Sequence, residues 1–304
     1  MDDKFFDILK QHNIDVKLNE PLKRYTTLNI GGEARYFVKS NNISELITVL
    51  KLSKEFHQKV LIIGAGSNML ISDKGFEGVV IKLSDEFCKF EIISNKVLCG
   101  AGVMLPLLIK TVVDYSLGGL EELFGIPGSV GGAIMMNAGT KVATISDNLE
   151  SIEAIKIDEP DKIVKFSKNE INFEYRKSNL ECFVIIKAIF NLKPADKNFL
   201  KERITNLLIE RNKTQPLGTF NVGCIFKNPQ GGKVSSAKLI EECGLKGFSC
   251  GDAYISEKHA NFIINKKNAT SEDFVNIIRY VIKKVKEKYG IELEPEIKLV
   301  NIEI

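Results

Sequence analysis

Residues 125–133 read Gly125-Ile126-Pro127-Gly128-Ser129-Val130-Gly131-Gly132-Ala133, and Asn137-Ala138-Gly139 follow shortly after. Glycine weakens both helices and strands, so we expect residues 125–139 to form neither a good helix nor a good strand. Ordering so many glycines costs backbone entropy, and a ligand held against bare backbone would offset that cost. A flexible surface loop is the alternative, but Ile126, Pro127 and Val130 are unusually apolar for one. The stretch therefore predicts a ligand-binding loop.

A second glycine loop, Gly64-Ala65-Gly66-Ser67-Asn68, follows a predicted buried strand at residues 60–63. Glycines there let backbone N–H groups approach an anion, although a tight turn after a strand would also need them. The loop lacks the third glycine of the dinucleotide fingerprint G-x-G-x-x-G, because Met69 stands at that position. A Rossmann domain is therefore not supported.

The rest of the chain alternates between helical and strand periodicity. Helices are predicted at 42–56, 105–117, 198–213, 236–243 and 271–289, with Gly118-Gly119 ending the second and Gly290 the last. Strands are predicted at 60–63, 79–83, 151–158, 162–166, 182–192 and 297–304, and a hairpin at 90–99. This mixture predicts an α+β protein. A domain boundary is expected near residue 200, where a long helix begins and the glycine-rich segments end.

Bulk composition narrows the function classes. The 304 residues are 44% hydrophobic and 27% charged, with a net charge of +3, which argues against a dedicated nucleic-acid binder. Six cysteines form no CxxC pair and no histidine cluster joins them, so no metal site is expected. The start, Met1-Asp2-Asp3-Lys4, lacks the order of a signal peptide, and no apolar run is long enough to span a membrane. A cytoplasmic location is therefore expected.

Seven ordered segments together resemble one family. They are Tyr25-Thr26-Thr27-Leu28-Asn29-Ile30-Gly31-Gly32, the two glycine loops, Tyr175-Arg176-Lys177-Ser178, Gly223-Cys224-Ile225-Phe226-Lys227-Asn228-Pro229, Ser256-Glu257-Lys258-His259-Ala260-Asn261 and Leu293-Glu294-Pro295-Glu296. In this order they resemble the UDP-N-acetylenolpyruvoylglucosamine reductases, and the resemblance spans about residues 20–300.

The resemblance implies a fold and a cofactor. The fold is the vanillyl-alcohol-oxidase (PCMH-type) FAD-binding fold of two subdomains, here 1–80 and 81–200, plus a C-terminal α+β domain, 201–291, for the UDP-sugar. A final strand carrying Glu296, at about 292–304, is expected to return to the second subdomain. The implied contacts of non-covalently bound FAD are Thr26, Thr27, Gly64, Ala65, Gly66, Ser67, Asn68, Gly125, Ile126, Pro127, Gly128, Ser129, Gly131, Gly132, Ala133 and Asn137.

The resemblance also implies a reaction. NADPH reduces FAD, hydride then passes to C3 of the enolpyruvyl group of UDP-N-acetylglucosamine enolpyruvate, and a proton to C2 gives UDP-N-acetylmuramate for peptidoglycan synthesis. Arg176 matches the family's arginine beside the substrate carboxylate, where a guanidinium suits bidentate binding. Cys224 stands where most of the family has a serine acid; a thiol is the stronger acid, although a cysteine is often simply buried. Glu296 matches the second polarising residue, with Glu294 as its neighbouring rival.

Further side chains are implied to bind the substrate. They are Tyr175, Lys227, Asn228, His259 and Asn261. Lys227 and Asn228 can donate hydrogen bonds to the pyrophosphate or the sugar, whereas a lone histidine such as His259 is more often structural. Tyr175-Arg176 run almost directly into the strand predicted at 182–192, so the chain resembles the shorter subclass that lacks an inserted tyrosine loop.

Two other interpretations stay open at this point. Another FAD-dependent oxidase of the same fold would share the glycine loops but not the segments around Cys224 and Glu296. Several such oxidases attach FAD covalently through a histidine or cysteine, and the nearest histidine to either loop is His57. A non-enzymatic flavin or UDP-sugar binding module would not need Arg176, Cys224 and Glu296 together. The site residues, not the fold, separate these interpretations.

Overall fold

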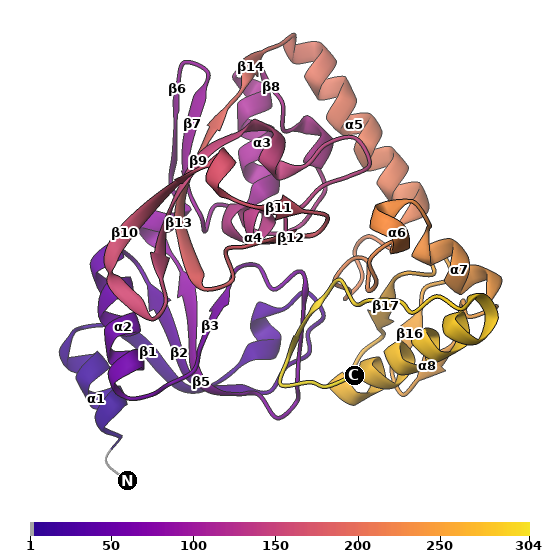
Figure 1. The fold of residues 1–304 in the computed structure, drawn as a ribbon, viewed down its shortest axis with the longest axis horizontal. Helices are drawn as coiled ribbons and strands as arrows, with labels where there is room; N and C mark the ends of the chain where they lie inside the picture. The colour runs from indigo at the N-terminus through magenta and orange to yellow at the C-terminus, as the bar shows by residue number, and fades with distance from the viewer. Residues whose placement is uncertain (1–2) are drawn as a thin grey trace. The chain divides into compact units, whose positions relative to one another are not determined.

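The computed structural model describes residues 3–304, which form two compact units drawn in Figure 1. The first unit comprises residues 3–20, Ala34–Ala65 and Glu77–Ile209; the second comprises Pro21–Glu33, Gly66–Phe76 and Glu210–Ile304. Residues 1–2, part of the segment assessed for a signal peptide, lie outside the described residues. The second unit is therefore assembled from three separate stretches of chain.

The first unit contains a four-stranded sheet in the order β1-β2-β5-β3. Its strands are β1 (Asp15–Pro21), β2 (Glu33–Ser40), β5 (Phe76–Leu83) and β3 (Val60–Ile63), and the helices α1 (Lys4–Gln11) and α2 (Ile43–Glu55) belong to the same unit. The predicted strand at 60–63 is confirmed, and the strand predicted at 79–83 begins earlier. β3 and β5 run parallel, with Ile63 opposite Lys82. This pairing sets Lys82 beside the start of the loop that follows β3.

A five-stranded antiparallel sheet, in the order β10-β9-β13-β7-β6, completes the core of the first unit. Its strands are β6 (Phe90–Ile93), β7 (Lys96–Gly100), β9 (Leu149–Lys156), β10 (Glu159–Ser167) and β13 (Phe183–Asn191), which confirms the predicted hairpin and three predicted strands. Helix α3 (Leu105–Asp114) ends before Gly118-Gly119, so that predicted end is wrong. The chain leaves the helix at Ser116, whose φ is +58°, and Gly118 pairs in β8 (Leu117–Gly118) with β14 (Lys193–Pro194).

The expectation that residues 125–139 lack a helix is also wrong, because Val130–Met135 form α4. Ser129 caps this helix. The N–H of Gly131 donates to the carbonyl of Ala101 at 2.8 Å, and a Cβ on Gly131 would lie 2.8 Å from the Ala101 Cβ. Glycine is therefore required there by a tertiary contact, which overrides its poor helix propensity.

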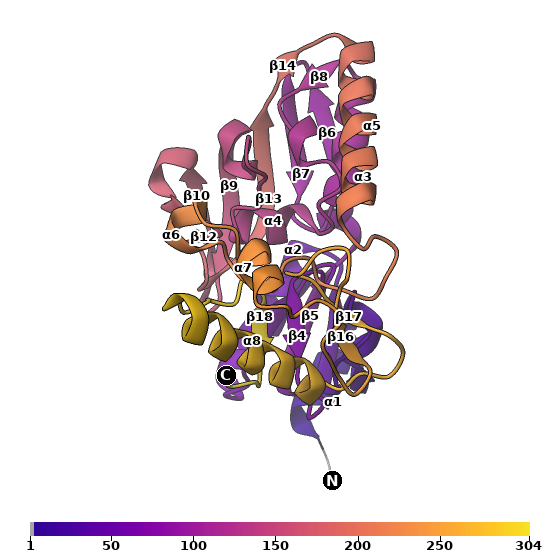
Figure 2. The ribbon, with the colours of Figure 1, turned by 90° about the vertical axis from the view of Figure 1, so that its right-hand side faces the viewer.

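The second unit combines a two-stranded and a three-stranded sheet with the 3-10 helix Leu22–Tyr25, the end of α5 (Lys197–Thr214) and three further α-helices. Parallel strands β4 (Met69–Ile71) and β18 (Lys298–Val300) pair, as do antiparallel β15 (Ser249–Cys250), β16 (Ala253–Ile255) and β17 (Ile263–Asn265). The three further α-helices are α6 (Pro229–Gly232), α7 (Ser236–Glu242) and α8 (Ser271–Tyr289); α8 lies against the three-stranded sheet (Figures 1 and 2).

The last strand and the last helix test two sequence predictions in this unit. The bounds of α8 are as predicted, with Thr270 capping its start and Gly290, at φ +67°, its end. The strand predicted at 297–304 is wrong in length: only 298–300 pair with β4, and Glu296 precedes the strand.

Helix α5 (Lys197–Thr214) confirms the helix predicted at 198–213, and the division between the units falls within it, after Ile209. The three-part division into 1–80, 81–200 and 201–291 stays a prediction. Over residues 3–304, no helix is both long enough and apolar enough to cross a membrane.

Candidate functional site

The start of the 64–68 loop meets the middle of the 125–133 loop in the first unit. A Cβ on Gly64 would lie 2.5 Å from the Ser129 Oγ, so the absence of a side chain at Gly64 lets the two loops approach. The Lys82 Nζ donates to the Gly64 carbonyl at 2.7 Å, and burial lowers the pKa of Lys82. The loops that contain Gly64 and Ser129, both predicted to bind the cofactor, are thus neighbours. The cationic side chain of Lys82 lies beside Gly64.

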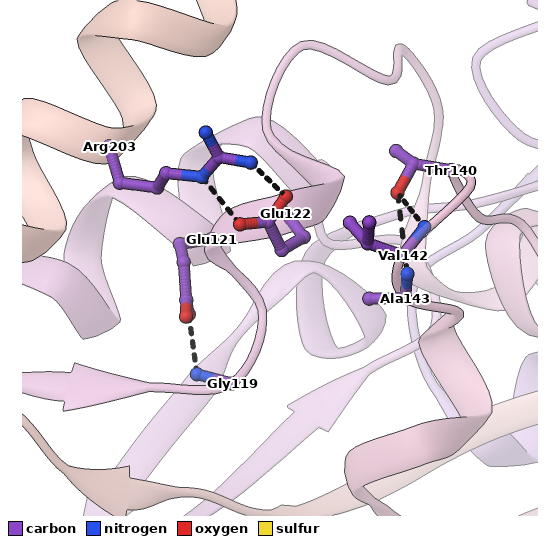
Figure 3. Close-up of polar contacts among 7 residues, drawn as sticks. All are labelled: Gly119, Glu121, Glu122, Thr140, Val142, Ala143 and Arg203. Carbon is purple, nitrogen blue, oxygen red and sulfur yellow. Dashed lines mark hydrogen bonds and ion pairs between the residues drawn. The ribbon is translucent and has the colours of Figure 1, made fainter.

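Polar contacts lie before and after the glycine-rich segment, and Figure 3 draws them. Before the segment, the Glu122 carboxylate accepts two hydrogen bonds from the Arg203 guanidinium, at 2.5 and 2.8 Å. After it, the Thr140 hydroxyl accepts from the backbone N–H groups of Val142 and Ala143 at 3.3 and 3.4 Å. Residues 125–139 therefore lie between a short 3-10 helix, Glu121–Leu123, that is bonded to Arg203 and a hydrogen-bonded turn at 140–143, and Gly125 and Gly128 adopt φ of +86° and +146° between them.

The predicted carboxylate-binding arginine lies at the tip of a hairpin that is tied to this segment. Strands β11 (Phe173–Glu174) and β12 (Lys177–Ser178) pair, which leaves Tyr175 and Arg176 as the connecting turn. Arg176 is half-buried with φ +58°, and its guanidinium lies 5.1 Å from the centre of the Tyr175 ring. The Asn137 Nδ2 donates to the Glu174 carbonyl at 3.0 Å, so a predicted cofactor contact holds the turn that carries a predicted catalytic residue.

The other part of the 64–68 loop lies in the second unit, against the Tyr25-Thr26-Thr27 segment. A Cβ on Gly66 would lie 2.0 Å from the Tyr25 carbonyl oxygen, and the Thr27 N–H donates to the Gly66 carbonyl at 3.1 Å. The Thr26 hydroxyl is buried and donates to the Ile30 carbonyl at 2.8 Å. The structure brings these predicted FAD contacts together. Gly66 and Thr26 also stabilise the fold, Gly66 through its close approach to Tyr25 and Thr26 through its hydrogen bond to Ile30.

The segments carrying Cys224 and Glu296 run side by side in the second unit. Phe226 bridges to Pro295 in an antiparallel pair, the Glu296 N–H donates to the Ile225 carbonyl at 2.7 Å, and Lys227 N–H donates to the Glu294 carbonyl at 2.9 Å. Both Cys224 and Glu296 are half-buried.

The glycine loop also reaches this pair of segments. The Asn68 Nδ2 donates to the Glu296 carbonyl at 3.2 Å, and the Lys298 N–H donates to the Asn68 carbonyl at 2.9 Å. Two predicted catalytic residues that are far apart in sequence are thus held by one stretch of paired backbone, next to a predicted cofactor loop.

Arg211 adds a charge to this neighbourhood. Burial lowers the pKa of Arg211, and the nearby Cys224, when ionised, opposes that shift. Sequence reasoning missed both Arg211 and Lys82. A basic residue inside the apolar strand at 79–83 was an available signal for Lys82, whereas Arg211 lies among the many charges of α5 and gave none.

Predicted substrate contacts Lys227 and Asn228 already have partners within the protein. The Lys227 Nζ lies 2.5 Å from the Glu294 Oε1, and the Asn228 Oδ1 accepts from the Ser236 N–H at 3.0 Å. Glu294, the rival of Glu296, is therefore engaged as an ion-pair partner. Lys227 keeps a partly exposed side chain, with an exposed fraction of 21%.

Of the two remaining predicted substrate contacts, Asn261 is buried and His259 is half-buried. Asn261 is 2% exposed; its Oδ1 accepts from the Phe226 N–H at 2.9 Å and its Nδ2 donates to the Phe226 carbonyl at 2.8 Å. The His259 ring packs edge-on against Phe262, and burial, with a smaller contribution from Lys246, lowers the pKa of His259. Asn261 thus fixes the backbone of Phe226, directly before Lys227, and its role toward substrate stays a prediction.

Two observations in the first unit fit a cofactor bound at α4. Gly132 is exposed, and a Cβ there would meet only the Ser129 Oγ at 3.3 Å, so protein packing does not require glycine at that position. The Asn137 Oδ1 is buried and, within the described chain, has no hydrogen-bond partner. A group that approaches the backbone closely and donates a hydrogen bond would satisfy both, and FAD has such groups.

Comparison with known proteins supports the family resemblance over nearly the entire chain. Residues 215–300 match the C-terminal domain of UDP-N-acetylenolpyruvoylglucosamine reductase, and residues 34–160 match an FAD binding domain. The reductase of Caldanaerobacter subterraneus subsp. tengcongensis is 39% identical over 301 residues, covering 98% of this chain and 97% of the relative. That of Caldicellulosiruptor saccharolyticus is 41% identical over 303 residues, covering 98% and 96%.

Solved structures support membership of the same family. The crystal structure of the Thermus caldophilus reductase superposes with a TM-score of 0.81 at 34% identity, covering 94% of this chain and 98% of that one. A berberine bridge enzyme variant, at TM-score 0.50 and 12% identity over 64% of this chain and 44% of its own, shares the fold alone. The fold is thus the vanillyl-alcohol-oxidase-type FAD-binding fold with a C-terminal α+β domain. The chain therefore belongs to the UDP-N-acetylenolpyruvoylglucosamine reductase family and is an FAD-dependent oxidoreductase.

Proposed function

We propose that the chain carries out the reaction of its family: the NADPH-dependent reduction of UDP-N-acetylglucosamine enolpyruvate to UDP-N-acetylmuramate through FAD, in peptidoglycan precursor synthesis. The observation that best supports it is the pairing of residues 225–227 with 294–296, which brings the backbone beside Cys224 next to that of Glu296. An oxidase of the same fold would have no use for a thiol acid and a carboxylate on paired backbone. The proposal also assigns the protein to the cytoplasm, where NADPH and nucleotide sugars are available.

The cofactor would be held by the glycine-rich segments, with Thr27, Gly64, Gly66, Ser129 and Asn137 among its contacts. When bound, FAD supplies the hydride that C3 of the enolpyruvyl group receives. The protein's own task is to orient the substrate and to stabilise the charge that hydride addition leaves on C2 and the carboxylate.

Arg176 would bind the substrate carboxylate. Its position in a two-residue turn, with the Tyr175 ring 5.1 Å from the guanidinium carbon, presents a planar cation at the tip of a fixed hairpin. Because negative charge grows on the carboxylate only after hydride addition, the guanidinium stabilises the product of that step more than the substrate.

Cys224 would give its S–H proton to C2, leaving a thiolate. The cationic Arg211, close enough to Cys224 to interact electrostatically, would stabilise that thiolate until a solvent proton restores the thiol. Glu296 would polarise the intermediate or relay the proton. Lys227, now paired with the exposed Glu294, would exchange that partner for the substrate's pyrophosphate.

The purified protein tests this proposal directly. It should be yellow, release its flavin on denaturation, and oxidise NADPH faster when the enolpyruvyl substrate is added. A colourless protein that does not bind added FAD would contradict the proposal. Flavin that stays on the denatured chain would favour the oxidase alternative.

Replacement of the thiol tests the identity of the acid. Cys224→Ser should keep substantial activity, since a hydroxyl can fill the same role, and should retain it at alkaline pH where the parent thiol ionises. Cys224→Ala should bind FAD and be reduced by NADPH, yet turn over at least about a hundred times more slowly. Turnover of Cys224→Ala at the parent rate would move the acid role to Glu296 or to a water molecule.

A further inference from the structure

The two ends of the Asn137 side chain have different surroundings. The residue is 7% exposed, its Nδ2 donates to the Glu174 carbonyl at 3.0 Å, and its Oδ1 is buried with no hydrogen-bond partner in residues 3–304. Because a carbonyl can only accept, the amide nitrogen must face Glu174, and the orientation of the amide is fixed. The oxygen therefore faces elsewhere, at a place where a donor is required.

The carbonyl that Asn137 holds belongs to the residue just before the Tyr175-Arg176 turn. Phe173 pairs with Ser178 and Glu174 with Lys177, so the Glu174 carbonyl marks where the turn begins. The far side of the hairpin is tied separately, since the Ser178 hydroxyl donates to the Met135 carbonyl at 2.7 Å. The Asn137 and Ser178 side chains thus join α4 and the residues after it to the hairpin, and of these two side chains Asn137 has a buried end that is unsatisfied within residues 3–304.

We propose that Asn137 is a positioning residue that aligns Arg176 with the bound cofactor. Its Oδ1 accepts a hydrogen bond from an N–H or O–H of the cofactor, while its Nδ2 holds the turn that carries the guanidinium. One side chain then sets the distance between the hydride donor and the group that binds the substrate carboxylate. This inference rests on the proposed function, because it takes Arg176 as the ligand of the substrate.

Three variants distinguish the role of the Asn137 Oδ1 from that of its Nδ2. Asn137→Gly removes both hydrogen bonds and tolerates the left-handed backbone, since φ is +42° at this position. Asn137→Asp keeps an oxygen acceptor but loses the donor to the Glu174 carbonyl. Ser178→Ala is the matched control, because it removes the other bond between the same hairpin and α4 without touching an unsatisfied group.

Two measurements on the holoenzyme read the two ends separately: flavin release on dilution, and stopped-flow reoxidation of the reduced flavin by the enolpyruvyl substrate. Asn137→Gly should weaken FAD binding by about threefold to tenfold, the worth of one hydrogen bond, and should slow reoxidation. In an Arg176→Ala background it should weaken FAD binding as before but slow reoxidation no further. Ser178→Ala should slow reoxidation and leave FAD affinity unchanged.

The aspartate variant keeps the test usable if Asn137→Gly does not fold, which thermal unfolding will reveal. Asn137→Asp should slow reoxidation while binding FAD more tightly than the glycine variant, or, where only the aspartate variant folds, within about threefold of the parent. Parent-like FAD affinity in Asn137→Gly would mean that Oδ1 meets a water molecule, and would overturn the proposal. Equal slowing of reoxidation with and without Arg176 would overturn it too. A parent protein that bound no FAD would instead refute the proposed function.

Discussion

Replacing Gly66 by alanine perturbs the closest backbone approach within the predicted cofactor loop. Gly66 has φ +61°, and its new Cβ would lie 2.0 Å from the Tyr25 carbonyl oxygen and 2.8 Å from the Thr26 Cα. Both are backbone atoms, so neither can rotate away. The Gly66 carbonyl also accepts from the Thr27 N–H at 3.1 Å, and any shift of the loop stretches that bond.

The expected loss of stability has three parts. A left-handed alanine costs about 1–2 kcal/mol. Forcing a methyl group into packed backbone costs about 1–3 kcal/mol, and weakening the Thr27 hydrogen bond about 1 kcal/mol. Gly66→Ala should therefore lower the free energy of unfolding by about 3–6 kcal/mol. Gly244→Ala is the matched control: φ is +71°, no atom lies within 4 Å of the Cβ, and the residue belongs to the same unit. It should cost only the left-handed contribution.

Urea denaturation followed by circular dichroism measures both variants, with and without added FAD. The Gly66 variant should unfold at lower urea and also bind FAD more weakly, because the Tyr25-Thr26-Thr27 segment must move to admit the methyl group. The Gly244 variant should keep the FAD affinity of the parent. If the two variants differed in unfolding free energy by less than about 1 kcal/mol, the close approach at Gly66 would not be the constraint on this loop.

Arg176→Ala and Glu296→Gln should slow reoxidation of the flavin by substrate much more than its reduction by NADPH, since charge at C2 develops only in the second step; equal slowing in stopped-flow traces would indicate a general structural defect. Asn261→Asp should lower the free energy of unfolding by about 3 kcal/mol, because it turns an oxygen toward the Phe226 carbonyl; a loss under 1 kcal/mol in urea would refute that role. Burial lowers the pKa of His259, so the folded state favours the neutral ring; this contribution to stability is present above the ordinary pKa of histidine and is lost as pH falls through the lowered one. His259→Asn should therefore lose less stability than the parent between pH 7 and pH 5, and equal losses in urea would contradict this.

Elements with local signals were predictable from the sequence. Helix Ser271–Tyr289 has a capping threonine directly before it and a left-handed glycine directly after it, so both signals are next to the helix in the sequence. The strand Val60–Ile63 is a short apolar run that ends at a glycine. Neither element depends on a partner that is distant in sequence, so the hydrophobic periodicity and the residues that begin and end each element were sufficient to predict it.

Helix Val130–Met135 was not predictable in this way. Glycine is required at position 131 because a Cβ there would lie 2.8 Å from the Ala101 Cβ, and Ala101 is too far away in sequence to enter a local helix propensity. The predicted site shows the same limit. Residue type tells which groups Asn261 and Lys227 can bind. Only the structure shows that the Asn261 side chain is bonded to Phe226 and that the Lys227 side chain is paired with Glu294.

The parallel pairing of β4 with β18 has a consequence for synthesis on the ribosome. The first unit is complete once Ile209 has been made, so it can fold while translation continues. Met69–Ile71 must wait for Lys298–Val300, and Leu70, fully buried in the finished protein, stays without its strand partner until then. Between the synthesis of Ile209 and that of Val300, the nascent chain thus carries an apolar strand that lies between two parts of the first unit and still lacks its partner strand.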